Sequence, residues 1–360
     1  MRSFKAILAI IFIIFISGGS FCQEKLKECL FWEKLDQGNV QCHLCPFECT
    51  LKNKQVGICQ SRQNMDGTLY SLTYARPVAL HEDPIEKKPL YHVYPGTLSF
   101  SIATAGCNLR CKFCQNWEIS QLDPKKVQGN IVMPENIVTL CERSKCRTIA
   151  FTYTEPTMFY EYMIDISKKA KEKGINSVMH SAGYINPEPA KELSKHIIAA
   201  NFDIKGIEDS FYTKMTGGHL QPVLEAIKIY KENGVWVEIT NLLIPAVNDS
   251  EEQLRKLCVW VKDNLGIETP VHFSRFHPMY KLINISPTPL SSLERAYKIA
   301  KETGLLYVYV GNAPEKSWND TICPGCGKVL VSRRGYNVIE NNIVNGKCNF
   351  CGRKTEGIWD

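Results

Sequence analysis

The sequence lacks any concentrated block of charge. Its 43 lysine and arginine residues outnumber 37 aspartate and glutamate residues, but the net charge of +6 is spread along the chain rather than collected in one basic arm. Proteins that bind nucleic acid need a basic patch or stripe for the phosphates. The charge pattern therefore gives no case for nucleic acid as a partner.

The amino terminus lacks an apolar run long enough for an ordinary membrane span. Arg2 and Lys5 precede an apolar run over residues 6–16, and small residues follow at 18–20. A span needs about 20 apolar residues, whereas this order is that of a secretory signal sequence. We expect residues 1–22 to be a signal peptide or membrane anchor, which predicts an exported or membrane-associated protein. An anchor with a cytoplasmic-facing chain is the alternative.

The central cysteine cluster lacks a fourth cysteine. In "GCNLRCKFCQNW", residues 106–117, Cys107, Cys111 and Cys114 have the spacing C-x3-C-x2-C. Structural zinc takes four ligands, and a four-iron cluster takes one ligand on each iron, so three cysteines leave one iron open for a substrate or cofactor. Three alternatives stay open on spacing alone: zinc with His92 as the fourth ligand, disulfides in an exported chain, and buried free thiols.

Complete sets of four cysteines flank this central cluster. The chain has 16 cysteines, and close C-x2-C pairs favour metal binding over disulfides. The carboxyl-terminal set has zinc-ribbon spacing, and we favour zinc over iron there. The amino-terminal set, which begins "CHLCPFEC", is expected to hold either zinc or an auxiliary iron–sulfur cluster. The two sets are Cys323, Cys326, Cys348 and Cys351, and Cys42, Cys45, Cys49 and Cys59.

A rhythm of strand-like and helix-like runs begins near residue 98. The expected strands lie at 98–104, 147–153, 175–180, 199–205, 235–243, 270–276 and 305–311. Amphipathic stretches lie between them: one begins near Thr157, and another follows Asp249 and Ser250. Alternation of this kind predicts an α/β fold with a parallel sheet, best matched by a complete or partial (β/α) TIM-type barrel. The cysteine-rich ends are expected to be small metal-binding appendages.

Polar side chains follow almost every expected strand. Barrel enzymes gather their functional groups at the carboxyl ends of the strands. The residues at or just past these ends are the three cysteines, Glu155, His180, Ser181, Asp203, Lys205, Asn241, His277 and Asn312. Asp203 and Lys205 are also close enough to form a simple ion pair, and a lone histidine is more often a loop residue than a catalyst. Their common position nevertheless predicts one shared active site.

Several ordered motifs resemble one known superfamily. Phe113, directly before Cys114, completes a C-x3-C-x-aromatic-C pattern that resembles the radical S-adenosylmethionine (radical SAM) superfamily. The resemblance continues from about residue 40 to the end. It rests on "ALHEDPIEKKPLYHVYPG", "SIATAGCNLRCKFCQNWEISQ", "FTYTEPTMFYEY", "NFDIKG", "GVWVEITNLLIPAVND", "SRFHP" and "YVYVGN". These stretches resemble the radical SAM member of the AmmeMemoRadiSam system, which is related to pyruvate formate-lyase activating enzymes.

The resemblance implies a fold of the radical SAM kind and a [4Fe-4S] cluster on the three central cysteines, with SAM on the open iron. In that family one electron cleaves SAM to methionine and a 5'-deoxyadenosyl radical, which abstracts hydrogen from a substrate. Further roles are implied for Phe113 against the adenine, Glu155 at the SAM amino group, Asp203 and Lys205 beside SAM, and His277, with Lys205 and His277 as the catalytic residues. The chain departs from its relatives in "SAGY", where Ala182 replaces an asparagine, and at Ala246, where glycine is usual.

The implied partners are a low-potential electron donor and a protein or small-molecule substrate, including Memo-like or AMMECR-like proteins. No glycyl-radical domain is evident in the sequence. A second hypothesis is an exported metal-binding or electron-transfer protein whose barrel no longer cleaves SAM, because an oxidising compartment threatens exposed clusters. The expected boundaries are a cysteine-rich region at 23–95, the barrel at 96–315 and a zinc-ribbon-like module at 316–360.

Overall fold

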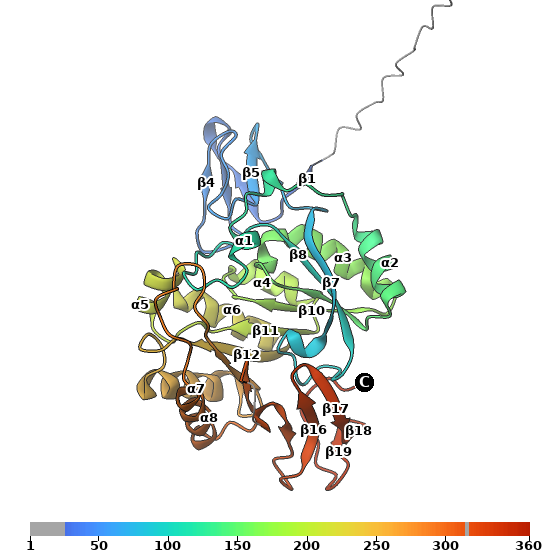
Figure 1. Cartoon of the computed structure of the whole chain (residues 1–360). Helices are drawn as coiled ribbons and strands as arrows, with labels where there is room; N and C mark the ends of the chain where they lie inside the picture. Colours follow the sequence, from blue (N-terminus) through green and yellow to red (C-terminus); the bar gives the residue numbers. More distant parts are fainter. Residues whose placement is uncertain (1–25, 314–316) are drawn as a thin grey trace, which may run out of the picture.

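The centre of the molecule is one eight-stranded sheet. The computed structural model describes residues 26–313 and 317–360, and the sheet has the order β14-β13-β12-β11-β10-β9-β8-β7 (Figure 1). Strands β8 to β14 are parallel, while β7 (Pro77–Pro84) pairs antiparallel with β8 at one edge. The parallel strands are β8 (Leu98–Thr104), β9 (Thr148–Phe151), β10 (Asn176–Ser181), β11 (Ala199–Asp203), β12 (Trp236–Leu243), β13 (Val271–Arg275) and β14 (Val308–Gly311). Since β7 and β14 are the two edges, the predicted barrel is of the partial kind.

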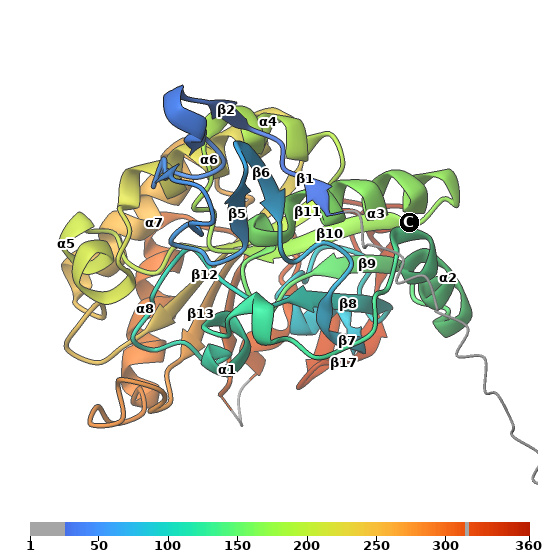
Figure 2. The same cartoon turned by 90° about the horizontal axis from the view of Figure 1, so that it is seen from above.

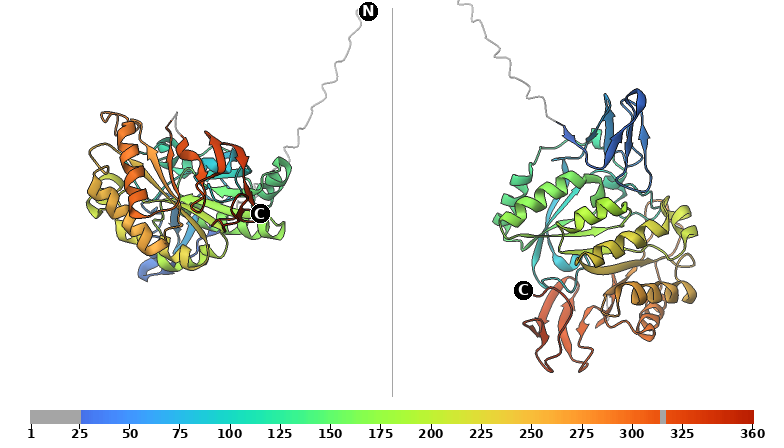
Figure 3. Two further views of the ribbon diagram at one scale, coloured as in Figure 1. Left: turned by 90° about the horizontal axis from the view of Figure 1, so that it is seen from below. Right: turned by 180° about the vertical axis from the view of Figure 1, so that it is seen from behind.

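Helices connect the strands, and the longer ones cover the outer face of the sheet. The view from behind in Figure 3 shows them side by side along that face. The helices are α1 (Trp117–Ser120), α2 (Pro134–Ser144), α3 (Tyr160–Glu172), α4 (Pro187–Ser194), α5 (Asp209–Phe211), α6 (Leu220–Glu232), α7 (Glu251–Leu265) and α8 (Leu290–Thr303). No helix in the described ranges is long and apolar enough to cross a membrane. The predicted signal-like segment, residues 1–22, lies outside the described residues.

Local sequence explains where these helices begin. The Ser250 hydroxyl accepts a hydrogen bond from the Gln253 amide, and the Gln253 side chain accepts one from the Ser250 amide, which is a capping box at the start of α7. The buried face of α7 includes Leu254, Leu257 and Val261. Helix α3 likewise buries one apolar face. Both helices follow the predicted pattern.

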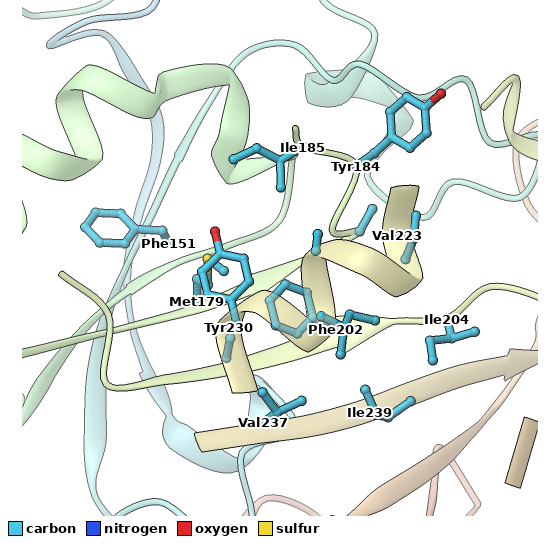
Figure 4. Close-up of a cluster of buried hydrophobic side chains, with 14 of the residues drawn as sticks. Phe151, Met179, Tyr184, Ile185, Phe202, Ile204, Val223, Tyr230, Val237 and Ile239 are labelled. Atoms are coloured by element: carbon cyan, nitrogen blue, oxygen red, sulfur yellow. The ribbon is translucent and has the colours of Figure 1, made fainter. Parts of the chain in front are cut away.

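The main core lies between the sheet and these helices. Phe151, Met179 and Phe202 come from neighbouring strands, and Tyr230 comes from α6; all four are buried (Figure 4). Figure 4 shows Phe202 beside Tyr230, and their ring centroids are 5.0 Å apart. This packing fixes the strands, and therefore the loops at their carboxyl ends, in place.

Two small cysteine-bearing regions flank the central sheet at opposite ends in Figure 1. The amino-terminal region has two three-stranded sheets, and seen from above it lies in front of the central sheet (Figure 2). Its strands are β1 (Lys27–Glu28), β2 (Trp32–Lys34), β3 (Val40–Cys42), β4 (Thr50–Leu51), β5 (Arg62–Met65) and β6 (Thr68–Ser71). The carboxyl-terminal strands are β15 (Thr321–Ile322), β16 (Val329–Arg334), β17 (Asn337–Asn341), β18 (Ile343–Val344) and β19 (Lys347–Cys348).

Candidate active site

A cavity of about 1080 Å³ lies at the carboxyl ends of the parallel strands. Most of the predicted strand-end residues line it, as the barrel rule requires. Asn241 does not, because its side chain is buried and donates a hydrogen bond to the Ile204 carbonyl at 2.7 Å. The predicted residues that line the cavity are Cys107, Cys111, Phe113, Cys114, Glu155, His180, Ser181, Asp203, Lys205, His277 and Asn312.

The cysteine loop between β8 and α1 is held by backbone contacts. The Arg110 amide donates to the Thr216 carbonyl at 2.7 Å, and the Lys112 amide donates to the Met215 carbonyl at 2.9 Å. The Leu109 amide donates to the Cys107 sulfur at 3.4 Å. Burial raises the pKa of the Cys111 thiol to about 11, although the nearby charge of Lys205 acts in the opposite direction. A metal that binds this sulfur would displace the proton.

The structure separates the alternatives for the three cysteines. None of them forms a disulfide, and no further cysteine lines the cavity among the described residues. His92 is not available as a fourth ligand, because Nδ1 lies 2.6 Å from the Glu356 carbonyl and Nε2 lies 2.7 Å from the Tyr309 hydroxyl. The donor set is thus three thiols on the wall of a large cavity. This set fits a four-iron cluster with one iron open to a ligand.

Glu155 is buried and almost fully hydrogen-bonded. Its Oε1 accepts from the Thr157 amide at 3.1 Å, the Thr157 hydroxyl at 2.8 Å and the Ser181 hydroxyl at 2.7 Å. Its Oε2 accepts only from the Ala182 amide, at 2.8 Å. A carboxylate oxygen can accept about two hydrogen bonds. A ligand ammonium would therefore approach Oε2 rather than Oε1.

Asp203 joins two basic side chains at the end of β11. Its Oδ2 lies 2.9 Å from Lys205 Nζ, and its Oδ1 lies 3.2 Å from His180 Nε2. Burial alone would raise the pKa of Asp203, but the Lys205 charge and the contacts with His180 outweigh it and hold the pKa well below its usual range. Burial would lower the pKa of Lys205, and the Asp203 carboxylate raises it above its usual range. Asp203 and Lys205 thus form an ion pair, and this pair fixes the Lys205 ammonium in the cavity wall.

The two remaining predicted residues differ in exposure. Phe113 is buried, and its ring centroid lies 6.0 Å from Lys205 Nζ. His277 is exposed where it lines the cavity. The first position suits a flat apolar contact surface deep in the site, and the second suits contact with a ligand that enters from solvent.

Sequence reasoning missed one wall of the cavity. The end of β16 contributes Arg333 and Arg334 to the lining, and the turn between β16 and β17 contributes Tyr336. The Arg333 guanidinium is buried, donates to the Tyr91 carbonyl at 2.8 Å and lies 4.3 Å from the centroid of the Tyr91 ring. His272, on β13, also lines the cavity and is held by Glu238 at 2.7 Å. No local pattern marks Arg333. His272 lies near the amino end of the predicted strand at 270–276, so a search of the carboxyl ends of the strands did not find it.

The carboxyl-terminal cysteines converge on one point. Among the described residues, this set is the one group of three or more His, Cys, Asp or Glu side chains whose ligand atoms all lie within 4.8 Å of one another. The Cys323 and Cys351 sulfurs are 3.7 Å apart, and those of Cys326 and Cys348 are 3.8 Å apart. Four sulfurs at about 2.3 Å from one tetrahedral ion would be about 3.8 Å from each other. The site therefore fits a single metal ion.

Comparisons with known proteins match the chain to the superfamily that its motifs resemble. A model of the radical SAM superfamily matches residues 101–258. An uncharacterized protein of Methanocaldococcus jannaschii is 46% identical over 333 residues, which are 92% of this chain and 99% of the relative. A putative glycyl-radical enzyme activating enzyme of the same organism is 30% identical over 177 residues, 47% of this chain and 71% of the relative. A pyruvate formate-lyase-activating enzyme of Clostridium pasteurianum is 27% identical over 216 residues, 55% of this chain and 87% of the relative.

Proposed function

The chain belongs to the radical SAM superfamily, and from this premise we propose that it is an enzyme that cleaves SAM reductively and oxidises a substrate held in the same cavity. When bound, the reduced cluster supplies the electron that splits SAM into methionine and a 5'-deoxyadenosyl radical able to abstract hydrogen. The observation that carries the proposal is the set of three unpaired thiols beside Glu155 and Lys205 on one cavity wall.

Different side chains are proposed to bind different groups of the cluster and SAM. Cys107, Cys111 and Cys114 are the cluster ligands, and their missing fourth partner leaves room for the amino and carboxylate groups of SAM. Glu155 offers Oε2 to the ammonium, because Oε1 already accepts three hydrogen bonds. Lys205, fixed by Asp203, offers a positive charge to the carboxylate.

The other predicted residues line the rest of the site. Phe113 provides an apolar ring for the adenine, and His277 faces the solvent side, where we place the substrate. The carboxyl-terminal module is proposed to hold zinc, because its sulfur distances match the edges of a zinc–thiolate tetrahedron.

A protein is the substrate class that the relatives favour, since two of them are named as activating enzymes of other enzymes. A small molecule is the alternative. The electron comes from a low-potential donor in either case. The predicted Memo-like or AMMECR-like partners, the membership of the AmmeMemoRadiSam group and the exported location stay predictions.

The test is SAM cleavage under anaerobic conditions. The full-length chain is reconstituted with iron and sulfide, reduced with dithionite and supplied with SAM, and 5'-deoxyadenosine is quantified. We expect the intact chain and Cys258→Ser to form it, because Cys258 is buried in α7 away from the cavity. The variant Cys107→Ala/Cys111→Ala/Cys114→Ala should form no more than a sample without protein. Equal product from the triple variant would refute the proposal.

A further inference from the structure

The amino-terminal cysteines form a buried group that the proposed function does not use. Cys42, Cys45 and Cys59 are each at most 8% exposed, Cys49 is partly buried, and none forms a disulfide. A Cβ added to Gly57 would lie 3.5 Å from the Cys59 sulfur and 3.9 Å from the Cys49 sulfur, so residue 57 lies between these two thiols. Free thiols gathered in one buried group are typical of metal ligands.

A backbone amide donates to one of these sulfurs in the same way as at the other two cysteine sites. The Ser61 amide donates to the Cys59 sulfur at 3.4 Å, two residues along the chain. The same relation, at 3.4 Å, joins Leu109 to Cys107 and Gly325 to Cys323. Hydrogen bonds to sulfur favour the thiolate and set the properties of iron–sulfur clusters. The amino-terminal site thus shares a local device with two sites that suit metals.

A buried positive charge also faces this group. Arg62 is 2% exposed, and its Nη1 lies 3.5 Å from the Cys42 sulfur. Its Nη2 pairs with Glu161, while its Nε has no hydrogen-bond partner among the described residues. A cation in this position would stabilise negative charge on the sulfurs. Several thiolates bound to a metal would supply that charge.

The spacing of the sulfurs favours a cluster over a single ion. The carboxyl-terminal sulfurs all lie within 4.8 Å of one another, as one tetrahedral ion requires, whereas neither the amino-terminal set nor the Cys107 set meets that limit among the described residues. A cluster spaces its ligands more widely, because each sulfur binds a different iron or shares one with a single partner. We propose that Cys42, Cys45, Cys49 and Cys59 bind a second iron–sulfur cluster.

This second cluster would lie directly against the loop of the first. The Arg110 side chain, from the loop between Cys107 and Cys111, donates to the carbonyl of Ile58, the residue before Cys59. Gly106 has φ +100°, and a Cβ there would come 2.7 Å from the Ser61 hydroxyl. The close approach of the two loops requires glycine at this position. The inference goes beyond the proposed function, which needs only one cluster.

The experiment removes the first cluster and asks what remains. The full-length Cys107→Ala/Cys111→Ala/Cys114→Ala variant is purified anaerobically, and its iron, sulfide and zinc are quantified. We expect about two to four irons per chain with matching sulfide, because four thiolates hold either a [2Fe–2S] or a [4Fe–4S] cluster. Adding Cys45→Ser and Cys59→Ser should reduce iron to background. Adding Cys258→Ser should not.

The opposite results are equally clear. Background iron in the triple variant, or two zinc ions per chain with no iron, would overturn the proposal. Cys49→Ser is a second variant that should not disturb folding, since Cys49 is the most exposed of the four cysteines. Its melting temperature should be unchanged, while its iron content or visible spectrum should differ from that of the triple variant. An unaltered spectrum would count against the assignment of Cys49. None of these readouts depends on SAM cleavage, so failure here and failure of the proposed function are distinguishable.

Discussion

His92 lies where the loop after β7, strand β14 and the carboxyl-terminal tail meet. A carbonyl oxygen can only accept, so Nδ1 must donate its proton to the Glu356 carbonyl, and Nε2 is left to accept from the Tyr309 hydroxyl. Tyr309 is itself 2.8 Å from the Thr321 hydroxyl. Burial lowers the pKa of His92 to about 4, against the opposing charge of Glu238. The folded chain therefore holds this imidazole neutral.

Stability should fall in mild acid for this reason. The unfolded histidine has a pKa of about 6.5, so the unfolded state binds a proton below that pH. The folded state binds this proton only when the pH falls to about 4. The free energy of unfolding should drop by about 2 kcal/mol between about pH 7.5 and pH 5 from this group alone. Denaturant unfolding at both pH values measures it. His92→Gln should reduce the pH dependence by that amount; an unchanged slope would contradict the assignment.

At the scale of elements, strand β5 is joined to helix α3 by a buried ion pair. The Arg62 guanidinium pairs with Glu161, and the two side chains are 2% and 1% exposed. The Leu30 amide also donates to the Glu161 carboxylate, at 2.8 Å. Removing one partner leaves the other charge buried without compensation, which costs about 3–5 kcal/mol. This contact fixes the amino-terminal region on the barrel.

A double-mutant cycle tests that anchor. We expect Glu161→Leu and Arg62→Met each to lower the free energy of unfolding by about 3 kcal/mol or more, and the double variant to lose much less than the sum. Chemical unfolding of the four proteins gives the coupling. Lys169→Met is the matched control, because Lys169 pairs with Glu135 on the exposed surface, where solvent screens the charges and the loss of the pair should change stability little. Strictly additive losses would show that the pair does not act as a unit.

Some of the strands could be predicted from the sequence, and others could not. Strand β8 spans the predicted residues 98–104, because Leu98, Phe100 and Ile102 alternate with serines, and a period of two is typical of a strand. Strand β14 begins at Val308, not at 305, since Leu305 and its neighbours connect α8 to the strand instead. Strand β7 was not predicted: it is an edge strand, and most of its residues are at least partly exposed, so no hydrophobic alternation marks it.

The site was predictable to the extent that it follows from the parallel sheet. Glu155 and Lys205 follow different strands, and parallel topology alone brings them to one cavity. The hydrogen bonds of Glu155 to Ser181 and Ala182 were not predictable, because they depend on side-chain packing between two strand ends. Arg333 was beyond sequence reasoning as well, since it contacts Tyr91 across 242 positions of the chain.

At the scale of the whole molecule, the carboxyl-terminal module forms one wall of the cavity. Arg333 on β16 donates to the Asn319 carbonyl at 3.0 Å, the Thr321 hydroxyl at 2.9 Å and the Tyr91 carbonyl at 2.8 Å. The last of these bonds ties the module to the loop that follows β7. A metal ion bound by Cys323, Cys326, Cys348 and Cys351, as proposed above, would hold the module together. Loss of the metal should therefore loosen the cavity wall that the module forms.

Hydrogen exchange can follow this connection without knowledge of the substrate. Cys348→Ala should lose one zinc ion per chain and exchange faster over both β16–β17 and residues 89–94. Arg333→Met should keep its zinc and speed exchange mainly at residues 89–94, by about tenfold or more, because a charged hydrogen bond contributes about 1.5–3 kcal/mol. Cys258→Ser should change neither region. If Cys348→Ala kept its zinc, the metal assignment would be wrong; if residues 89–94 exchanged normally in both variants, the module would not support the cavity.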